Sequence, residues 1–370
     1  MEKPSVLDMQ PHPIQAEETS FVQPNEALGT FKQAFPVAQK GQDPFPPNGS
    51  QIVGGGWRKS PVRPVRQRGV SCGGGCIFTT NFHGGGPPPP GMKIGWKTLP
   101  TADCPLFSRY MYQTTMVLKS FDGLAYYQFP HLDRYGGVVH GVFTRKGGVS
   151  QGPYESLNVA IHNGDRVEDV RENRRRMTEA LGGDVRLVCC TQVHGDGVHV
   201  LSRQDIDSLD ERRIIADALI TDIPGIVLVI QVADCQSVLL FDPKIRVIAN
   251  VHSGWRGSIA NIVGKTVRVM QERFGSKAEH IRAGIGPSLG PCCAEFIHYR
   301  TEIPETFWSY RIDETHFDFW RLTRDQLMAE GVLEDHIEDS GMCTRCCSDL
   351  FFSYRRQKVT GRFAAVILLR

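Results

Sequence analysis

One cysteine and two histidines in the second half of the chain are of the residue types that bind catalytic zinc. Cys235 ends the sequence ADC, His252 begins HSGWRG, and His194 lies upstream in TQVHG. A catalytic zinc ion has three protein ligands and keeps a fourth tetrahedral position open, and water bound there has a pKa lowered toward about 7. We therefore treat His194, Cys235 and His252 as candidate zinc ligands.

A hairpin is expected to bring two of these residues together. Two apolar runs rich in β-branched residues, 226–241 and 245–251, flank the turn sequence DPK at 242–244, and both runs are typical of buried strands. A tight turn centred after the proline pairs residues whose numbers sum to 487, as those of Cys235 and His252 do. Directly opposed residues have Cβ atoms roughly 5 Å apart, a common spacing for two ligands of one metal ion. A single Cys or His in an apolar strand is usually a core residue, so the metal hypothesis rests on this mutual geometry.

The other cysteines of the C-terminal half are expected to be structural. Cys292 and Cys293 follow a tight loop rich in Gly and Pro, and small buried thiols are the favoured interpretation. Cys343 and Cys346 form a single CxxC sequence with Cys347 adjacent. Because one such pair does not complete the four ligands of a structural zinc site, we do not expect a metal ion there.

The pattern of apolar residues from about residue 116 onward predicts an α/β domain. Its last strand, at 363–369, is apolar at every position, which indicates a sheet that is covered on both faces. The other expected strands are 138–144, 186–190, 198–201 and 281–285, and the expected helices are 165–181, 258–274 and 317–329. His194 thus lies in a loop between two strands, where its side chain can reach a cavity.

One single arginine and one cluster of three are candidates for binding anions. Arg256 lies two residues before the helix expected at 258–274, and a guanidinium beside the N–H groups of a helix N-terminus forms a site for phosphate. The three arginines at 174–176 lie on the helix expected at 165–181. A solvated face is the favoured interpretation for them, with part of the group reaching an anionic substrate as the alternative.

Composition favours a small-molecule substrate over a polymer or a membrane. The chain has 42 basic and 40 acidic residues and a formal charge of +2, which indicates neither nucleic acid nor a membrane surface as the main partner. No apolar run reaches the roughly 20 residues of a membrane span, and no secretion signal is visible at the N-terminus. Several of the 11 cysteines are adjacent, which favours reduced thiols and a cytoplasmic protein.

Residues 1–115 differ in composition from the rest of the chain. Between residues 41 and 100, 14 Gly and 10 Pro leave too little apolar surface for a packed core, so we expect a disordered extension before a globular domain at 116–370. A start of translation at Met111 or Met116 is the alternative origin of this segment. A metal knuckle in this segment is a weak hypothesis, because the spacer is Gly-rich; its ligands would be Cys72, Cys76 and either His83 or Cys104.

Four motifs together resemble those of the YfiH family. They are TQVHG at 191–195, ADALITD at 216–222, ADC at 233–235 and HSGWRG at 252–257. The similarity extends in order over about 140–370 and includes FTRKGGVSQGPYESLN at 143–158, IGPSLGPCC at 285–293 and FFSYRR at 351–356. The family usually has Ala at the position of Ser253 and an aromatic residue at that of Ala294, and neither is a candidate ligand.

The resemblance implies a fold, a cofactor and an activity. The fold is a single globular domain with mixed β-sheets flanked by helices, similar to that of YfiH and CNF1. The activity is that of a zinc-dependent purine nucleoside phosphorylase, which uses phosphate and adenosine, inosine or methylthioadenosine, and which also deaminates adenosine. Other zinc deaminases have HxE and PCxxC motifs, and neither occurs in this chain. The oligomeric state is left open.

The resemblance also implies roles for individual residues. It marks His194 as a metal ligand, and it places Arg145 with Arg256 at the phosphate. Asn158 and His162 are expected to bind the substrate. Asp234, beside the cysteine ligand, is a candidate catalytic residue that could orient a ligand, accept a proton or cap a bend.

Three other functions remain as alternatives. Members of the family are also described as peptidoglycan-editing factors, which implies an amidase that uses the same zinc site. Copper-dependent polyphenol oxidases bind several copper ions through HxH pairs, and none of the 12 histidines here stands two residues from another. A single Cu²⁺ could still occupy the zinc site, because such ligands bind it more tightly. A metal-binding module without catalytic activity is the third alternative.

Overall fold

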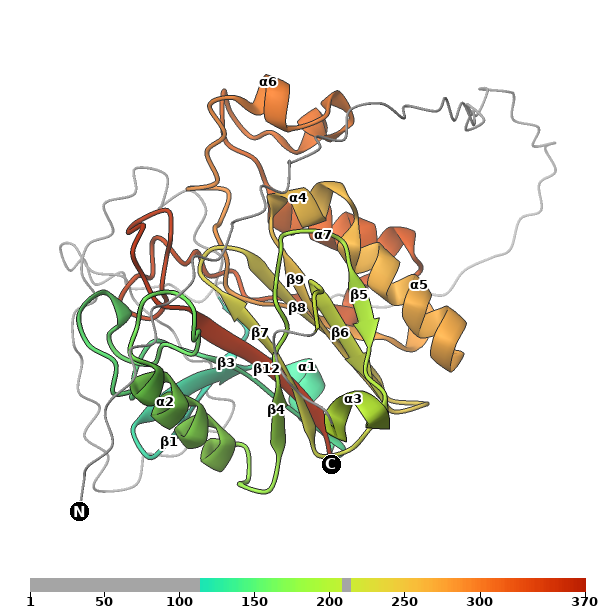
Figure 1. Cartoon of the computed structure of the whole chain (residues 1–370). Coiled ribbons are helices and arrows are strands. Elements are labelled where there is room, and N and C mark those ends of the chain that lie inside the picture. Colours follow the sequence, from blue (N-terminus) through green and yellow to red (C-terminus); the bar gives the residue numbers. More distant parts are fainter. Residues whose placement is uncertain (1–113, 208–213) are drawn as a thin grey trace, which may run out of the picture. The chain divides into compact units, whose positions relative to one another are not determined.

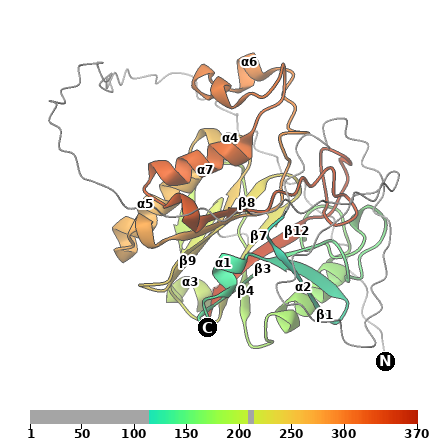
Figure 2. The ribbon, with the colours of Figure 1, turned by 180° about the vertical axis from the view of Figure 1, so that it is seen from behind.

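A computed structural model describes residues 114–207 and 214–370, and these fold into the strands and helices drawn in colour in Figures 1 and 2. The described residues all belong to one compact unit of the chain. None of their helices is long and apolar enough to cross a membrane. Several expectations for the N-terminal segment fall outside the described residues, namely the disorder of 1–113, the start at Met111 and the metal knuckle of Cys72, Cys76, His83 and Cys104.

The strands form two six-stranded sheets. The first sheet has the order β1-β2-β3-β12-β7-β4 and the second has the order β11-β10-β8-β9-β6-β5. Each sheet contains parallel and antiparallel pairs, for example β4 with β7 and β12 with β7. The strands are β1 (Val117–Phe121), β2 (Leu124–Gln128), β3 (Val138–Phe143), β4 (Arg186–Val188), β5 (Val198–Val200), β6 (Ala218–Thr221), β7 (Ile226–Val232), β8 (Gln236–Asp242), β9 (Val247–Ser253), β10 (Arg282–Ile285), β11 (Ile337–Asp339) and β12 (Phe363–Leu369).

The longest helices, α2, α5 and α7, lie on the outer faces of the two sheets, whereas Leu132 of the short α1 belongs to the cluster between them. Two of the longer ones agree with the expected positions at 165–181 and 317–329. The α-helices are α1 (Pro130–Asp133), α2 (Val167–Ala180), α3 (Arg203–Asp207), α4 (Trp255–Ile259), α5 (Ile262–Phe274), α6 (Tyr299–Glu302) and α7 (Phe319–Ala329). Short 3₁₀ helices are η1 (Gly152–Tyr154), η3 (Ala278–His280), η4 (Glu305–Tyr310) and η5 (Glu334–His336).

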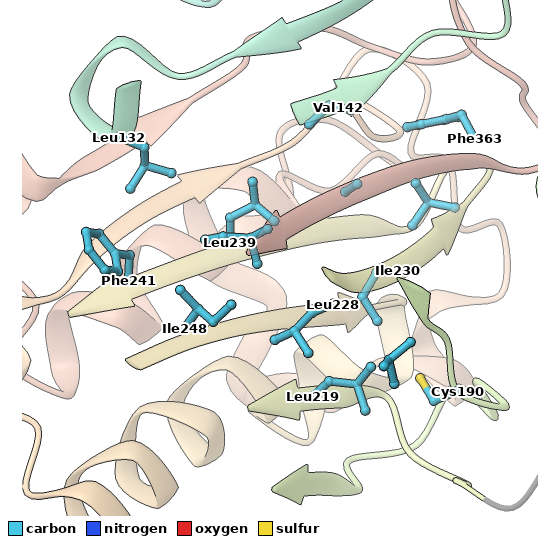
Figure 3. Packing of buried hydrophobic residues seen from close by; sticks show 14 of the residues in the cluster. Leu132, Val142, Cys190, Leu219, Leu228, Ile230, Leu239, Phe241, Ile248 and Phe363 are labelled. Atoms are coloured by element: carbon cyan, nitrogen blue, oxygen red, sulfur yellow. The ribbon is translucent and has the colours of Figure 1, made fainter. Parts of the chain in front are cut away.

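The two sheets pack face to face, and the prediction of mixed sheets flanked by helices is confirmed. One apolar cluster fills the space between the sheets and includes Ile230 of β7 and Leu239 of β8 (Figure 3). A second cluster packs α2 on the outer face of the first sheet, and a third packs α5 and α7 on the outer face of the second. β12 contributes Ile367 to the inner cluster and Val366 to the outer one, so this sheet is covered on both faces, as its apolar sequence predicts.

Two loops at one end of the sandwich carry the chain from the first sheet to the second. β4 leads through residues 189–197 to β5, and β7 leads through residues 233–235 to β8. Since β4 and β7 are parallel, both loops leave the first sheet at the same end. β9 is antiparallel to β8, so β9 ends where β8 begins. The topology therefore brings His194, Cys235 and His252 to one end of the two sheets.

The register expected for the β8–β9 hairpin is wrong by two residues. His252 lies opposite Ser237, and Cys235 lies just before β8. The loop has four residues instead of two, because the N–H of Lys244 donates to Oδ1 of Asp242 at 2.8 Å and Arg246 has a positive φ of 56°. A shift of two residues leaves each side chain on its original face of a strand, so the expected meeting of Cys235 and His252 survives the error.

The helix expected at 258–274 is two helices. Asn261, between α4 and α5, has a left-handed φ of 54°, and its side chain accepts the N–H of Gly264 at 3.0 Å. Arg256 lies within α4, a helix of five residues. The expected phosphate site at the N-terminus of one long helix is therefore corrected, since the partial charge of a helix end grows from aligned peptide dipoles and α4 has few of them.

Candidate metal centre and its cavity

His194, Cys235 and His252 meet at the end of the sandwich. One nitrogen atom of each imidazole and the sulfur atom of Cys235 all lie within 4.8 Å of one another. The two rings are edge to face, with centroids 4.8 Å apart. Zinc bonds of about 2.0–2.3 Å place the ligand atoms of one ion about 3.3–3.8 Å apart, so these side chains fit a small cation with little movement.

Asp217 holds both histidines from behind. Its Oδ1 lies 2.7 Å from Nδ1 of His252 and accepts the backbone N–H of His194 at 2.9 Å, and its Oδ2 accepts the N–H of Gly195 at 2.8 Å. The carboxylate favours the tautomer with hydrogen on Nδ1, which leaves Nε2 of His252 free to bind a metal ion. Asp217 lies within the ADALITD motif, but the sequence analysis assigned it no role. Its carboxylate is not itself a candidate ligand and only positions His194 and His252, which residue type and spacing do not reveal.

Neighbouring charges lower the pKa of the cysteine in this group. Burial raises the pKa of the Cys235 thiol, but His252 and His194 outweigh that effect and lower it to about 6. Burial lowers the pKa of His252, while Cys235 and Asp217 outweigh it and raise this pKa to about 9. The lowered pKa favours the thiolate form of Cys235, which is the form that binds a metal ion.

Gly254 gives the metal ligands the space that they occupy. A Cβ atom at this position would lie 3.0 Å from Cδ2 of His194 and 3.3 Å from Sγ of Cys235. Both distances are shorter than ordinary van der Waals contact. The first glycine of HSGWRG is thus explained by the close approach of two candidate ligands.

The three candidate ligands lie in the wall of a cavity of about 910 Å³. Pockets for small molecules are commonly 300–1,000 Å³, so this cavity has room for a nucleoside and an anion. Asp234, His162 and Arg256 line the same cavity, whereas Arg145 and Asn158 are not among its lining residues.

Asp234 uses both carboxylate oxygens to hold neighbouring loops. Thr344 Oγ1 donates to Oδ1 at 2.7 Å, and the backbone N–H of Arg355 donates to Oδ2 at 2.6 Å. Asp234 has a positive φ of 88°, and its carbonyl accepts the N–H of Leu289 at 2.8 Å. Of the three expected roles, these contacts favour the cap of a bend, because both carboxylate oxygens are occupied by groups of the protein.

The side chains of Asn158 and Arg145 bond to the protein itself and do not line the cavity. Asn158 is fully buried, and its amide donates to Oδ2 of Asp165 at 2.8 Å while its Oδ1 accepts the N–H of Arg362 at 2.8 Å. It thereby holds the loop that carries His162 into the cavity. The guanidinium of Arg145 donates to the backbone carbonyls of Glu155 and Ser348 and lies over the ring of Phe352, 4.5 Å from its centroid. Its donors are directed at the protein itself.

Four further arginine or lysine side chains line the cavity, namely Arg174, Arg355, Lys358 and Arg362. Only Arg174 was considered from the sequence, as part of the alternative in which the triple arginine reaches an anionic substrate. Arg175 and Arg176 form ion pairs with Glu172, as the solvated interpretation of the triple arginine predicts, but Arg174 lies at the cavity. Helical spacing separates Arg174 from its two neighbours around α2, but the sequence does not tell which side of this helix faces the cavity. The positive charge of the cavity is therefore larger than Arg256 alone would give.

A second group of candidate metal ligands lies outside the first. The sulfur atoms of Cys292, Cys293, Cys343 and Cys346 are all within 4.8 Å of one another. Sequence reasoning treated the two pairs separately and did not expect a metal ion at either. The signal was available in principle, because each pair follows a short strand, β10 or β11, and these strands are parallel neighbours.

Comparisons with known proteins show which family the chain belongs to. Residues 139–370 match the family model described as multi-copper polyphenol oxidoreductase laccase. The chain is 36% identical over 250 residues to the purine nucleoside phosphorylase YlmD of Geobacillus stearothermophilus, covering 63% of this chain and 90% of that protein. It is 35% identical over 243 residues to the purine nucleoside phosphorylase YfiH of Escherichia coli, covering 63% and 94%. The crystal structure of the Geobacillus YlmD protein superimposes with a TM-score of 0.61 at 33% identity, covering 70% of this chain and all of that one.

Proposed function

Because the chain belongs to the multi-copper polyphenol oxidoreductase laccase family, which includes the YfiH and YlmD proteins, we propose that it is a zinc-dependent purine nucleoside phosphorylase that also deaminates adenosine. The resemblance of its motifs to the YfiH family is thereby confirmed. The observation that carries the proposal is the group of His194, Cys235 and His252 in the wall of a cavity large enough for a nucleoside and phosphate. The names of the relatives support the choice of substrate.

In this proposal the metal ligands are His194, Cys235 and His252. The bound zinc ion would supply Lewis-acid activation of a water molecule or of a leaving group. Asp217 keeps His252 in the tautomer that binds metal, and Gly254 leaves room for the ligand side chains. Asp234 positions Cys235 through its bonds to the loops on either side.

Phosphorolysis requires compensation of the charge of phosphate. A phosphate oxygen forms a bond to C1′ of the ribose while the N-glycosidic bond breaks and the purine takes the bonding electrons. Arg256 is the residue that we assign to phosphate, and its guanidinium lies over the ring of Trp255, 4.2 Å from the centroid, which restricts its orientation. Arg174 and Arg362 add positive charge to the same cavity and lower the energy of the dianion there.

Aromatic side chains offer a surface for the purine base. Trp255, Phe296 and Tyr354 line the cavity together with His162. Flat aromatic faces bind a purine by stacking, and a histidine can hydrogen-bond to the base or the ribose. Asn158 is a positioning residue in this proposal, because its Oδ1 accepts the N–H of Arg362, which lines the cavity. Arg145 holds the backbone of Glu155 and Ser348, outside the lining of the cavity, and receives no role at the phosphate.

Product analysis of the purified full-length protein tests the proposed function. Zinc-loaded protein with adenosine and phosphate should form adenine and ribose 1-phosphate, and inosine should form with or without phosphate. Cys235→Ala should abolish all three products, while Cys347→Ala, at a cysteine outside both candidate metal groups, should retain them. Absence of all products from the zinc-loaded wild-type chain would refute the proposal, and release of an amino acid from a muropeptide precursor would favour the amidase instead.

A further inference from the structure

The sulfur atoms of four cysteines have the spacing of a metal site. Sγ of Cys346 lies 3.6 Å from that of Cys292 and 3.5 Å from that of Cys293, and the sulfur atom of Cys343 completes the group within 4.8 Å. Sulfur atoms in a disulfide are about 2.05 Å apart. In a tetrahedral zinc site with bonds of about 2.3 Å they are about 3.8 Å apart. The observed distances match the second arrangement.

We propose that Cys292, Cys293, Cys343 and Cys346 bind a structural zinc ion, in addition to the ion at His194, Cys235 and His252. The four thiols bind as thiolates and release their protons, so the site carries a formal charge of −2 with Zn²⁺ bound. Nη1 of Arg345 lies 3.6 Å from the sulfur atom of Cys293 and offsets part of this charge. The donor set is complete with four sulfur atoms, as in closed structural sites, and leaves no position for substrate.

The surroundings of the four cysteines are those of a buried structural site. Cys292, Cys293 and Cys343 are 8%, 2% and 6% exposed, and Cys346 is half-buried. The ring of Trp320 packs in the same cluster, and its Nε1 donates to Oγ of Ser288 at 2.6 Å. Exclusion of water strengthens metal–thiolate bonds and slows oxidation of the sulfur atoms.

The fold positions the two cysteine pairs without help from the metal. β10 and β11 are parallel neighbours, with Ala283 opposite Ile337, so the segments that follow them leave the sheet side by side. Those segments stay paired through a bridge between Ser288 and Cys343 and through the N–H of Thr344, which donates to the carbonyl of Ser288 at 2.9 Å. A zinc ion at their ends would fasten them together.

This second ion would stabilise the part of the cavity wall that Asp234 and Leu289 form. Thr344, between Cys343 and Cys346, donates to the carboxylate of Asp234, and Leu289, three residues before Cys292, donates its N–H to the Asp234 carbonyl. Asp234 directly precedes the ligand Cys235 in sequence. The inferred zinc site therefore supports the loops that position one ligand of the first site, but it takes no part in the reaction.

Metal content of the full-length protein tests the inference independently of activity. Protein produced with excess zinc and freed of weakly bound ions should hold one zinc ion fewer per chain in Cys346→Ser and in Cys292→Ser than in the wild type. Cys347→Ser is the matched control, since this adjacent cysteine is outside the group, and it should keep the wild-type content. Cys235→Ser should lose one zinc ion from the site of His194, Cys235 and His252. The zinc content of the two kinds of variant therefore shows for each site separately whether it binds an ion.

A second measurement on the wild-type chain covers the case in which the variants do not fold. Replacement of zinc by Co²⁺ should give the intense sulfur-to-cobalt absorption of a four-thiolate site, and this band should persist in Cys235→Ser. Alkylation of the native protein followed by mass spectrometry should label the four cysteines together only after a chelator is added. Equal labelling with and without chelator, or disulfides among these cysteines in protein isolated without reductant, would overturn the inference.

Discussion

Asp217 and His252 form a buried carboxylate–imidazole pair, with Oδ1 of Asp217 2.7 Å from Nδ1 of His252. The same carboxylate accepts two backbone N–H groups of the loop that carries His194. Burial raises the pKa of Asp217, but the bonds from His252 and from the loop N–H groups outweigh it and hold this pKa below its usual value. One ionised group thus fixes ligands from two different segments of the chain.

Replacement of Asp217 should therefore weaken the first metal site without removing a ligand. We expect Asp217→Asn to lower its zinc affinity about 10- to 100-fold, because the charge that stabilises the Nδ1–H tautomer is lost. Competition with a chelator measures the change. Asp196→Asn is the control, since Asp196 is two residues from His194 but forms an exposed ion pair with Lys265. Equal affinities of the two variants would contradict the role assigned to Asp217.

Gly254→Ala should disturb the metal ligands while the fold persists. The added methyl group would push against His194 and Cys235, as the distances of 3.0 and 3.3 Å require. We expect zinc affinity to fall at least tenfold, with a melting temperature of the metal-free protein close to that of the wild type. Gly136→Ala, at a position with open space around its Cβ, should change neither quantity. Unchanged zinc affinity in Gly254→Ala would contradict the role assigned to Gly254, because His194 and Cys235 would then accommodate the methyl group without loss of binding free energy.

Arg256 should determine the KM for phosphate. Arg256→Gln removes the guanidinium over Trp255, and we expect the KM for phosphate to rise at least tenfold in phosphorolysis, with deamination of adenosine less affected. Arg256→Lys should restore part of the loss, because it keeps the charge but not the planar geometry. Arg175→Gln, at an arginine paired with Glu172 on the surface, serves as the control. Equal loss of both reactions would assign Arg256 to the nucleoside instead.

His140 should make the folded chain sensitive to acid. Burial lowers its pKa to about 4, an effect that the neighbouring Asp133 and Glu338 only partly oppose, and its Nε2 accepts the N–H of Phe129 at 2.8 Å. The unfolded chain takes up a proton near pH 6.5 and the folded chain near pH 4, so stability is lost as the pH falls through this interval, on the order of 3 kcal/mol.

The variant His140→Gln isolates this contribution. Glutamine can accept the same N–H but does not titrate, so the free energy of unfolding should fall less steeply between pH 6.5 and 4 than in the wild type. Denaturant unfolding of metal-loaded protein at several pH values measures both slopes. Both proteins lose metal in acid to the same extent, so this loss cancels in the difference between their free energies of unfolding. If the two free energies fall in parallel with pH, His140 is excluded as the acid-sensitive group.

Local pattern was sufficient to predict much of the fold. β12 was expected at the bounds that the structure has, because its run of apolar residues is uninterrupted, and α2 was recognised from its apolar periodicity and the glycines after it. The candidate ligands were found from residue type and motif. The hairpin register was not, because loop length depends on a side-chain bond of Asp242 and on the left-handed conformation of Arg246, which composition does not specify.

Contacts between distant segments were beyond local pattern. The grouping of Cys292 with Cys343 depends on the parallel pairing of β10 with β11, and the two strands are separated by some fifty residues in the sequence. The environment of Arg145 depends in the same way on Ser348, which lies in a loop far along the chain. Residue spacing within one segment predicts neither the grouping of the cysteines nor the surroundings of Arg145.

The two crossings between the sheets give the first metal site a dependence on assembly. His194 and Cys235 come from separate passages of the chain between the sheets, and both passages pack on the apolar cluster that the sheets share. A metal ion bound at this position would therefore join the two passages. The affinity of the site for its ion should therefore decrease when the packing between the two sheets is weakened. A substitution deep in the shared core should be detectable as a faster release of the ion.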